Sequence, residues 1–370
     1  MKRNYVINIG VFIICAILCL ALFGCVQQVK NENSTKVGVI LPLTGFLANV
    51  GKDTQNAIEL AVNDANALTK IELIYEDDAC DSTKAVTAYQ KLASVDKVNF
   101  IIGPFCGQSA IAILPLLNND RVISISPGAP DNELSKPNDY FFRTRIPNKS
   151  ETKIIVDYLV SKGIFKVAVY TARNTFGQSY HDSFVNQFVD VGGEIVFDDG
   201  SADYQVDFKT DLLKIKEKNP QAIFLVPASR QQMGIFAKQA RELGVDILFT
   251  GGAVTEQQDL LDAAGIAANG IIYPYVSPKN MEIFYKYVAG YGKIPSMEAL
   301  NGYDAFNILF GQIQVCDGNK ECVRNNLNKL KDFNGAEGLI SFDENGDSRT
   351  ILGLKQVKDE KFVLLSDTND

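Results

Sequence analysis

Apolar and polar residues alternate along most of this chain in a pattern typical of strands separated by helices. Short apolar runs occupy residues 36–41, 71–75, 99–103 and 122–126, with amphipathic stretches between them. In the stretch 51–66, Ile58, Ala61 and Val62 fall on one face at helical spacing. Continuously apolar strands separated by helices predict parallel pairing, with helices on both faces of the sheet.

The same alternation restarts after residue 147. Apolar runs occupy residues 167–170, 194–197, 222–226, 247–252 and 270–275. Helices are predicted at 151–162, 176–191 and 230–243, with one more through Leu213. Three helices (279–291, 297–315 and 322–331), a hairpin around Asn345-Gly346 and a strand at 361–365 complete the chain. The predicted fold class is α/β, with two units of similar size.

The N-terminus has a different pattern. Lys2 and Arg3 precede an uninterrupted apolar run from Val11 to Phe23. A positive start, an apolar middle and a small residue at the end are typical of a secretory signal. The run is shorter than the ~20 residues that a membrane-spanning helix needs. We interpret residues 1–24 as a signal peptide; the alternative is a membrane anchor that stays in place.

The end of this run carries a cysteine. Leu22-Phe23-Gly24-Cys25 resembles the lipobox of prokaryotic lipoproteins, in which the thiol is acylated and the chain is cut just before it. Two acyl chains are enough for stable anchoring. Residues 25–35 are polar and without apolar period, as in a tether. We therefore expect an exported protein, in the periplasm or on the cell surface, held to the membrane only by a lipid on Cys25.

Composition narrows the function classes. After the signal, about 345 residues remain, enough for two ordinary domains. The formal charge is −8 and becomes −10 without Lys2 and Arg3. Nucleic acids and anionic lipid head groups require a basic face, so neither is an expected partner. A single histidine, His181, leaves little material for a metal site, and we expect neither a metal nor a cofactor.

The remaining cysteines suggest disulfides. Of the seven, Cys15 and Cys19 lie inside the signal and Cys25 is the proposed lipid site. The other four form two sequence-local couples, Cys80 with Cys106 and Cys316 with Cys322. An even number in an oxidising compartment favours two disulfides. The alternative is a metal site, although CxxC spacing and a nearby histidine are both missing.

Two junctions between strands and helices carry candidate chemistry. "IIGPFCGQSA" (101–110) and "ISISPGAPDNEL" (123–134) each end a strand with Gly, Pro and small polar residues. In α/β sheets, ligands bind at the carboxyl ends of parallel strands, and N–H groups at a helix start favour an anionic group. Tight turns without a ligand are the alternative. Signatures of an enzyme, such as a nucleotide-binding glycine loop or a GxSxG elbow, are absent from the sequence.

These motifs resemble those of the branched-chain amino-acid binding proteins, the type I substrate-binding proteins of ABC importers. The similarity is carried by "YEDDACDSTKAV" (75–86), "IIGPFCGQSA", "ISPGAP" and "GLISFDENGD" and extends over nearly the whole mature chain. It implies two doubly wound parallel-sheet lobes joined by three crossovers, with a ligand between them. It also implies a Cys80–Cys106 disulfide.

Some positions of this sequence match the binding residues of the family, and others differ from them. The family often has serine where Gly107 stands and serine or threonine where Pro130 stands, and its amine-binding acid aligns with Ala253. The site residues expected on this basis are Cys106, Gly107, Gln108, Ser109, Gly128, Ala129, Pro130, Asp131, Phe176, Ser229, Ala253 and Glu256.

The departures concern the ligand. A buried ammonium without a carboxylate partner is costly. We therefore expect a small anionic or amphipathic solute, held by the N–H groups that follow Cys106 and flanked by Phe176. Amino acids such as leucine are the alternative, if Glu256 or Asp131 supplies the missing charge.

The sequence thus predicts a solute-binding lipoprotein that captures an amino acid or related carboxylate and passes it to an ABC transporter permease. The predicted lobes are residues 36–147 with 279–347, and 148–278 with 348–370. A ligand sensor of the same fold is the alternative. An enzyme is not expected, because it would require a nucleophile or cofactor loop that the sequence lacks.

Overall fold

The computed structural model describes residues 34–67, 70–276, 280–350 and 352–365. The predicted signal peptide, Cys25 and nearly all of the predicted tether lie outside these residues. Thr35, the last residue assigned to the tether, instead pairs with Ile71 in a sheet. No helix in the described part of the chain is long and apolar enough to cross a membrane.

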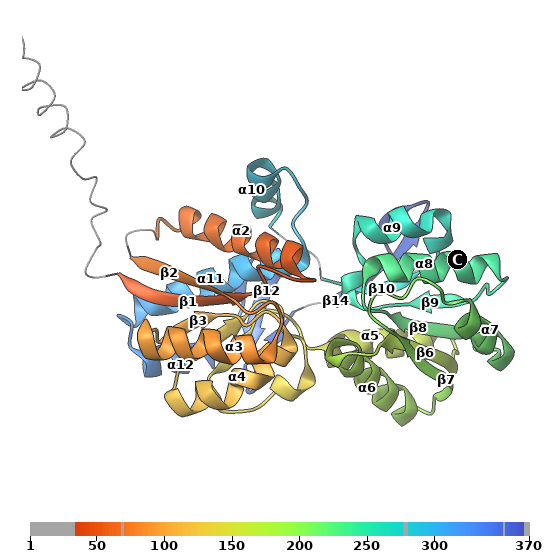
Figure 1. The fold of residues 1–370 in the computed structure, drawn as a ribbon, viewed down its shortest axis with the longest axis horizontal. Coiled ribbons are helices and arrows are strands. Elements are labelled where there is room, and N and C mark those ends of the chain that lie inside the picture. The colour runs from red at the N-terminus through yellow and green to blue at the C-terminus, as the bar shows by residue number, and fades with distance from the viewer. Residues whose placement is uncertain (1–33, 68–69, 277–279, 351, 366–370) are drawn as a thin grey trace, which may run out of the picture. The chain divides into compact units, whose positions relative to one another are not determined.

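The first sheet has five parallel strands in the order β2-β1-β3-β4-β5. Figure 1 labels β1, β2 and β3 of this sheet. They are β1 (Thr35–Leu41), β2 (Ile71–Asp77), β3 (Phe100–Ile102), β4 (Ile123–Ser126) and β5 (Phe141–Arg143). The helices around it are α2 (Ala48–Asp64), α3 (Ser82–Gln90, continued by a π-helical turn at Lys91–Val95), α4 (Gly107–Asp120), α10 (Met281–Tyr291), α11 (Met297–Val315) and α12 (Lys320–Leu327).

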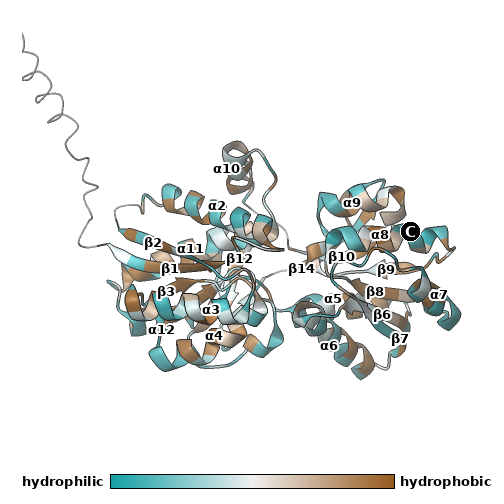
Figure 2. Ribbon diagram, viewed as in Figure 1, coloured by the Kyte–Doolittle hydropathy of each residue, from teal (hydrophilic) through white to brown (hydrophobic). Residues whose placement is uncertain are grey.

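Apart from the edge strand β2, which is only partly buried after Ile71, the strands of this sheet are buried on both faces. In β1, Val37 and Val39 pack into a cluster with α2 and α11, whereas Ile40 packs into a second cluster with α3 and α4. The alternation follows from the period-two geometry of a strand. Apolar side chains on both faces explain why these strands are continuously apolar in sequence. In Figure 2 the strands are largely brown, the apolar end of the scale, whereas the helices also carry hydrophilic teal.

The second sheet has seven strands in the order β15-β14-β10-β9-β8-β6-β7. They are β6 (Lys166–Ala172), β7 (Glu194–Ser201), β8 (Ala222–Val226), β9 (Leu248–Thr250), β10 (Ile272–Val276), β14 (Leu352–Lys358) and β15 (Lys361–Leu364). Strands β6 to β10 are parallel, and β14 and β15 are antiparallel additions. One face packs against α5 (Asn148–Ser161) and α6 (Thr175–Asp190), the other against α7 (Lys209–Lys218), α8 (Arg230–Glu242) and α9 (Gln258–Ala264).

The predicted fold class is confirmed: two doubly wound, mainly parallel sheets, each with its helices, form two lobes. Between β5 and α5 the chain leaves the first lobe, between β10 and α10 it returns, and between β13 and β14 it passes over again. The helix predicted through Leu213 is α7, which begins at Lys209 and continues to Lys218. Helix α9 was not predicted, since Gln258–Ala264 is too short for a clear period.

The predicted hairpin around Asn345-Gly346 is present but short. A small antiparallel sheet joins β11 (Phe333–Gly335), β12 (Gly338–Phe342) and β13 (Ser348–Arg349). The loop 343–347 turns at Gly346, which adopts a left-handed conformation (φ 72°). Because β13 pairs with β12, Ser348 and Arg349 lie with the first lobe, beyond the boundary predicted after Asp347.

A buried ion pair joins the first and third passages between the lobes. Arg143, the last residue of β5, contacts Asp347 with Nε and Nη2, each 2.7 Å from Oδ1. Both side chains are almost fully buried. The remaining donors of Arg143 bond to Ala129 O (2.9 Å), Asp131 O (2.8 Å) and Ser135 Oγ (2.8 Å). All five N–H groups of the guanidinium therefore have an acceptor.

We expect Asp347→Ala to destabilise the protein strongly. Removing one partner leaves a buried guanidinium without its counter-charge, which typically costs about 3–5 kcal/mol. Urea unfolding of the mature protein measures the change. Asp157→Ala, which removes a pair with Lys153 on an exposed surface, is the control and is expected to cost at most about 1 kcal/mol. Equal effects of the two substitutions would contradict the central role of Arg143.

Candidate ligand-binding site

A cavity of about 370 Å³ lies where the carboxyl ends of the parallel strands of both sheets meet. On the first-lobe side its lining includes Phe46, Ala79, Cys80, Phe105, Cys106, Gly107, Gln108, Gly128, Pro130, Asp131 and Glu298. On the second-lobe side it includes Asn174, Phe176, Tyr204, Pro227, Ala228, Ser229, Arg230, Met233, Gly252, Val254 and Thr255. This position at the strand ends is the one that α/β sheets use for ligands.

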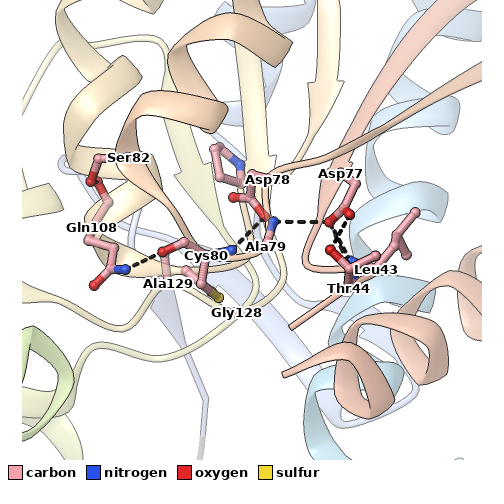
Figure 3. Close-up of a disulfide and its surroundings, with 12 residues drawn as sticks. Leu43, Thr44, Asp77, Asp78, Ala79, Cys80, Ser82, Gln108, Gly128 and Ala129 are labelled. Carbon is pink, nitrogen blue, oxygen red and sulfur yellow. Dashed lines mark hydrogen bonds between the residues drawn. A yellow bond between two sulfur atoms is a disulfide. The ribbon is translucent and has the colours of Figure 1, made fainter. Parts of the chain in front are cut away.

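Loops after β1 and β2 are fixed by one aspartate. Asp77 Oδ1 accepts hydrogen bonds from the N–H groups of Leu43 (2.8 Å), Thr44 (3.2 Å) and Ala79 (2.9 Å), as Figure 3 shows. The Thr44 hydroxyl donates to Oδ2 at 2.6 Å. Burial alone would raise the pKa of Asp77, but these donors outweigh it and lower the pKa. The loop that carries Phe46 to the cavity is thereby attached to the end of β2.

The start of α4 is attached to the β2 end by a disulfide. Cys80 and Cys106 are bonded, with their Cα atoms 5.4 Å apart. The Gln108 amide donates to Cys80 O, and the Ser82 hydroxyl donates to Gln108 O at 3.2 Å. Figure 3 shows Ser82, Gln108 and Cys80 near one another, on three different segments of the chain. The second disulfide, Cys316–Cys322, connects the end of α11 to α12 and does not line the cavity.

Gly107, where the resemblance implies serine, lies directly against Asp131. A Cβ on Gly107 would overlap the carboxylate oxygens of Asp131, so a larger residue does not fit unless Asp131 moves. Asp131 is 3% exposed. Its burial raises the pKa of the carboxyl to about 6, although Arg143 and Arg145 oppose this shift. A carboxyl group thus lies beside the helix start at which the resemblance implies a ligand carboxylate.

On the second lobe, α8 begins at the cavity. The Ser229 hydroxyl accepts from the N–H of Gln232 at 3.2 Å and caps the helix. Arg230 follows, and its Nε donates to Val254 O at 2.8 Å. One Nη of Arg230 lies 3.6 Å from Oε1 of Glu298, at the start of α11 in the first lobe. This pair places a cation and an acid from different lobes at the cavity.

A buried network of hydrogen bonds and an ion pair holds the backbone at Ala253. The N–H of Ala253 donates to Glu151 Oε2 at 2.7 Å, and the Tyr180 hydroxyl donates to the same oxygen at 2.6 Å. Arg145 forms an ion pair with Glu151, and both side chains are almost fully buried. Burial alone would lower the pKa of Arg145, but Glu151 and Tyr180 outweigh it and raise the pKa. The loop is therefore held without an acid at residue 253.

Glu256, one of the two acids expected to replace the missing charge, is engaged elsewhere. Its carboxylate lies 2.6 and 2.9 Å from Lys355 Nζ and accepts from the Tyr273 hydroxyl at 3.2 Å. Glu256, Ser109, Ala129 and Ala253 are not among the residues that line the cavity. The other eight expected site residues line it together. Of the two candidate acids, only Asp131 lines the cavity.

Sequence reasoning missed most of the lining, including Phe46, Arg145, Tyr204, Arg230 and Glu298. Phe46 and Tyr204 lie on loops of different lobes, and their rings pack edge to face with centroids 5.6 Å apart. Arg230 had a usable signal, because it directly follows an N-cap serine at the end of a buried strand. In the described part of the chain, no group of three or more His, Cys, Asp and Glu side chains could hold a metal ion.

The fold and the strand-end cavity define a two-lobed binding protein, and comparison with known proteins supplies its family. The sequence matches the family described as periplasmic binding protein over residues 34–358, and the chain belongs to this family. Such proteins bind solutes for ABC importers and are exported; they are not enzymes. This agrees with the predicted function class.

Curated relatives and solved structures agree on the family. The chain is 25% identical to the Leu/Ile/Val-binding protein of Citrobacter freundii over 272 residues, 70% of this chain and 73% of the relative. An ABC transporter solute binding protein from Rhodopseudomonas palustris, in complex with 3,4-dihydroxy benzoic acid, is 30% identical (TM-score 0.80; 90% and 96% of the chains covered). A branched-chain amino acid transporter substrate binding protein from Streptococcus pneumoniae, in complex with isoleucine, is 27% identical (TM-score 0.78; 89% and 97% covered).

Replacing both Cys80 and Cys106 by Ser removes their disulfide. We expect this double change to lower the free energy of unfolding by about 3–4 kcal/mol, because the disulfide closes a long loop. The matched Cys316/Cys322 double change, which opens a loop with a sequence separation of 6 rather than 26, is expected to cost about 2 kcal/mol. Urea unfolding and a non-reducing peptide map check both. Free thiols at all four positions in the exported protein would refute the pairing.

Proposed function

We propose that this protein captures a small organic carboxylate with an apolar body between its two lobes and delivers it to an ABC transporter permease. The cavity at the strand ends of both sheets carries this proposal. A solute in it touches both lobes and favours the arrangement in which both contacts are made.

The lining supports the chemical class of the solute. Phe105, Phe176 and Met233 offer apolar surface, and Arg230 offers a cation. The volume of about 370 Å³ lies within the range of small-molecule sites. Residue 253 lacks an acid, and Glu256 is paired with Lys355, so an α-ammonium group has fewer partners here than the resemblance implies. These features favour a carboxylate over an ordinary amino acid.

Mass spectrometry of the compound retained by the purified mature protein tests this proposal, followed by calorimetry. We expect a carboxylate, with leucine and isoleucine binding more weakly or not at all. Ala228→Trp places a large ring in the cavity lining and should reduce binding at least tenfold, whereas Ile266→Trp, at an exposed position outside the lining, should not. Tight leucine binding, unaffected by Ala228→Trp, would contradict both the ligand class and the site.

We further propose that export uses residues 1–24 as a signal peptide and that a lipid on Cys25 anchors the mature protein. The support is the charged start, the apolar run and the "LFGC" motif. Protein recovered from membranes is expected to begin at Cys25 and to carry two or more acyl chains. Cys25→Ser should abolish lipidation, while the double change of Cys316 and Cys322 to Ser serves as the control that keeps it. A mature chain beginning at Met1 would sink this proposal.

A further inference from the structure

The charged residues around the cavity are distributed unevenly between the lobes. From the first lobe, Asp131 and Glu298 line it, and both are more than nine-tenths buried. From the second lobe comes Arg230. Asp203, also on that side, is exposed and accepts a hydrogen bond from the Asn174 amide at 3.2 Å. The buried acids therefore lie on the first lobe and the available cation on the second.

Arg230 differs from Arg145, the other arginine of the lining. The guanidinium of Arg145 is taken up by Glu151, by Ile146 O (3.2 Å) and by the Tyr180 hydroxyl (3.2 Å). Arg230 bonds to Val254 O through Nε alone, and its 3.6 Å separation from Glu298 exceeds hydrogen-bond distance. Its Nη groups thus keep donors for a bidentate contact with a carboxylate.

The side chain of Asp131 offers hydrogen-bond acceptors, whereas Arg230 offers donors. Its backbone carbonyl is held by Arg143, yet no neighbouring side chain in the described part of the protein donates a hydrogen bond to its carboxyl oxygens. The charged groups acting on it are Arg143, Arg145 and Glu133. This carboxyl lies directly against Gly107. The resemblance implies a serine at residue 107 that binds the ligand carboxylate, and the Asp131 carboxyl occupies the space of that serine side chain. A second carboxylate at this place would be repelled, whereas a hydroxyl or ammonium donor would find an acceptor.

We propose that the ligand binds with its carboxylate at Arg230 on the second lobe and with a hydrogen-bond donor, a hydroxyl or an ammonium group, at Asp131 on the first lobe. This orientation is the reverse of the one that the resemblance implies, and it rests on the proposed function. The solute is then a carboxylate with a ring-sized apolar body and a donor at the end away from the carboxylate. Phe105 and Phe176 lie in the lining beside this body.

Calorimetry with two matched probes tests the orientation: 4-hydroxybenzoate has the donor, and benzoate lacks it. Arg230→Gln should weaken both probes at least tenfold, because each loses its charged partner. Asp131→Asn should weaken 4-hydroxybenzoate alone and remove its preference over benzoate. Arg241→Gln, on the same helix but outside the lining, and Glu217→Gln, an exposed acid outside the lining, are the controls and should leave both affinities unchanged.

The unmodified protein supplies a second test that does not depend on a variant folding. As the pH falls from about 7.5 to about 5.5, the Asp131 carboxylate becomes protonated and the preference for 4-hydroxybenzoate should shrink. Two results would overturn the orientation but keep the proposed function. One is a preference for 4-hydroxybenzoate that grows as the pH falls. The other is benzoate binding that becomes stronger in Asp131→Asn and stays unchanged in Arg230→Gln. If the unmodified protein binds neither probe and retains no carboxylate, the proposed ligand class fails and the orientation fails with it.

Discussion

The arrangement of this protein depends on the buried guanidinium of Arg143. It ends the last strand of the first sheet, immediately before the chain passes to the second lobe, and it binds Asp347 immediately before the third passage. Its backbone N–H also donates to Gly346 O at 3.0 Å. A buried guanidinium tolerates no missing acceptor, so these segments are constrained together. The same side chain holds Ala129 O and Asp131 O, and thereby sets the loop that lines the cavity.

The departures from the family pattern at the site are connected with one another. Gly107 leaves the space that the Asp131 carboxyl fills, and a side chain at one position excludes the observed place of the other. Ala253 lies in a loop whose backbone is bound by Glu151, which is in turn paired with Arg145. Both positions at which the resemblance implies another residue therefore lie beside buried charges: Asp131 beside Gly107, and Glu151 with Arg145 behind Ala253.

Solved relatives show how little the fold itself restricts the solute. One related structure contains isoleucine and another 3,4-dihydroxy benzoic acid, yet both match this chain with TM-scores close to 0.8. The sheets supply loops at the strand ends, and side chains on those loops decide which groups are recognised. Here the lining carries the charged residues Asp131, Arg145, Asp203, Arg230 and Glu298, which distinguish this cavity from a purely apolar one.

Local sequence determined the elements and the fold class, because buried strands and amphipathic helices carry their own periods. It also determined that residues such as Cys106, Gly107 and Asp131 lie at strand ends, where a cavity forms. Only the tertiary structure decided which of them meet. Glu256 lies three residues from Ala253 but points its carboxylate to Lys355 on β14, a strand distant in sequence. Arg230 and Glu298 come from different lobes. The sequence pattern does not predict such a pair, because the fold determines which distant charged residues become neighbours and are buried together.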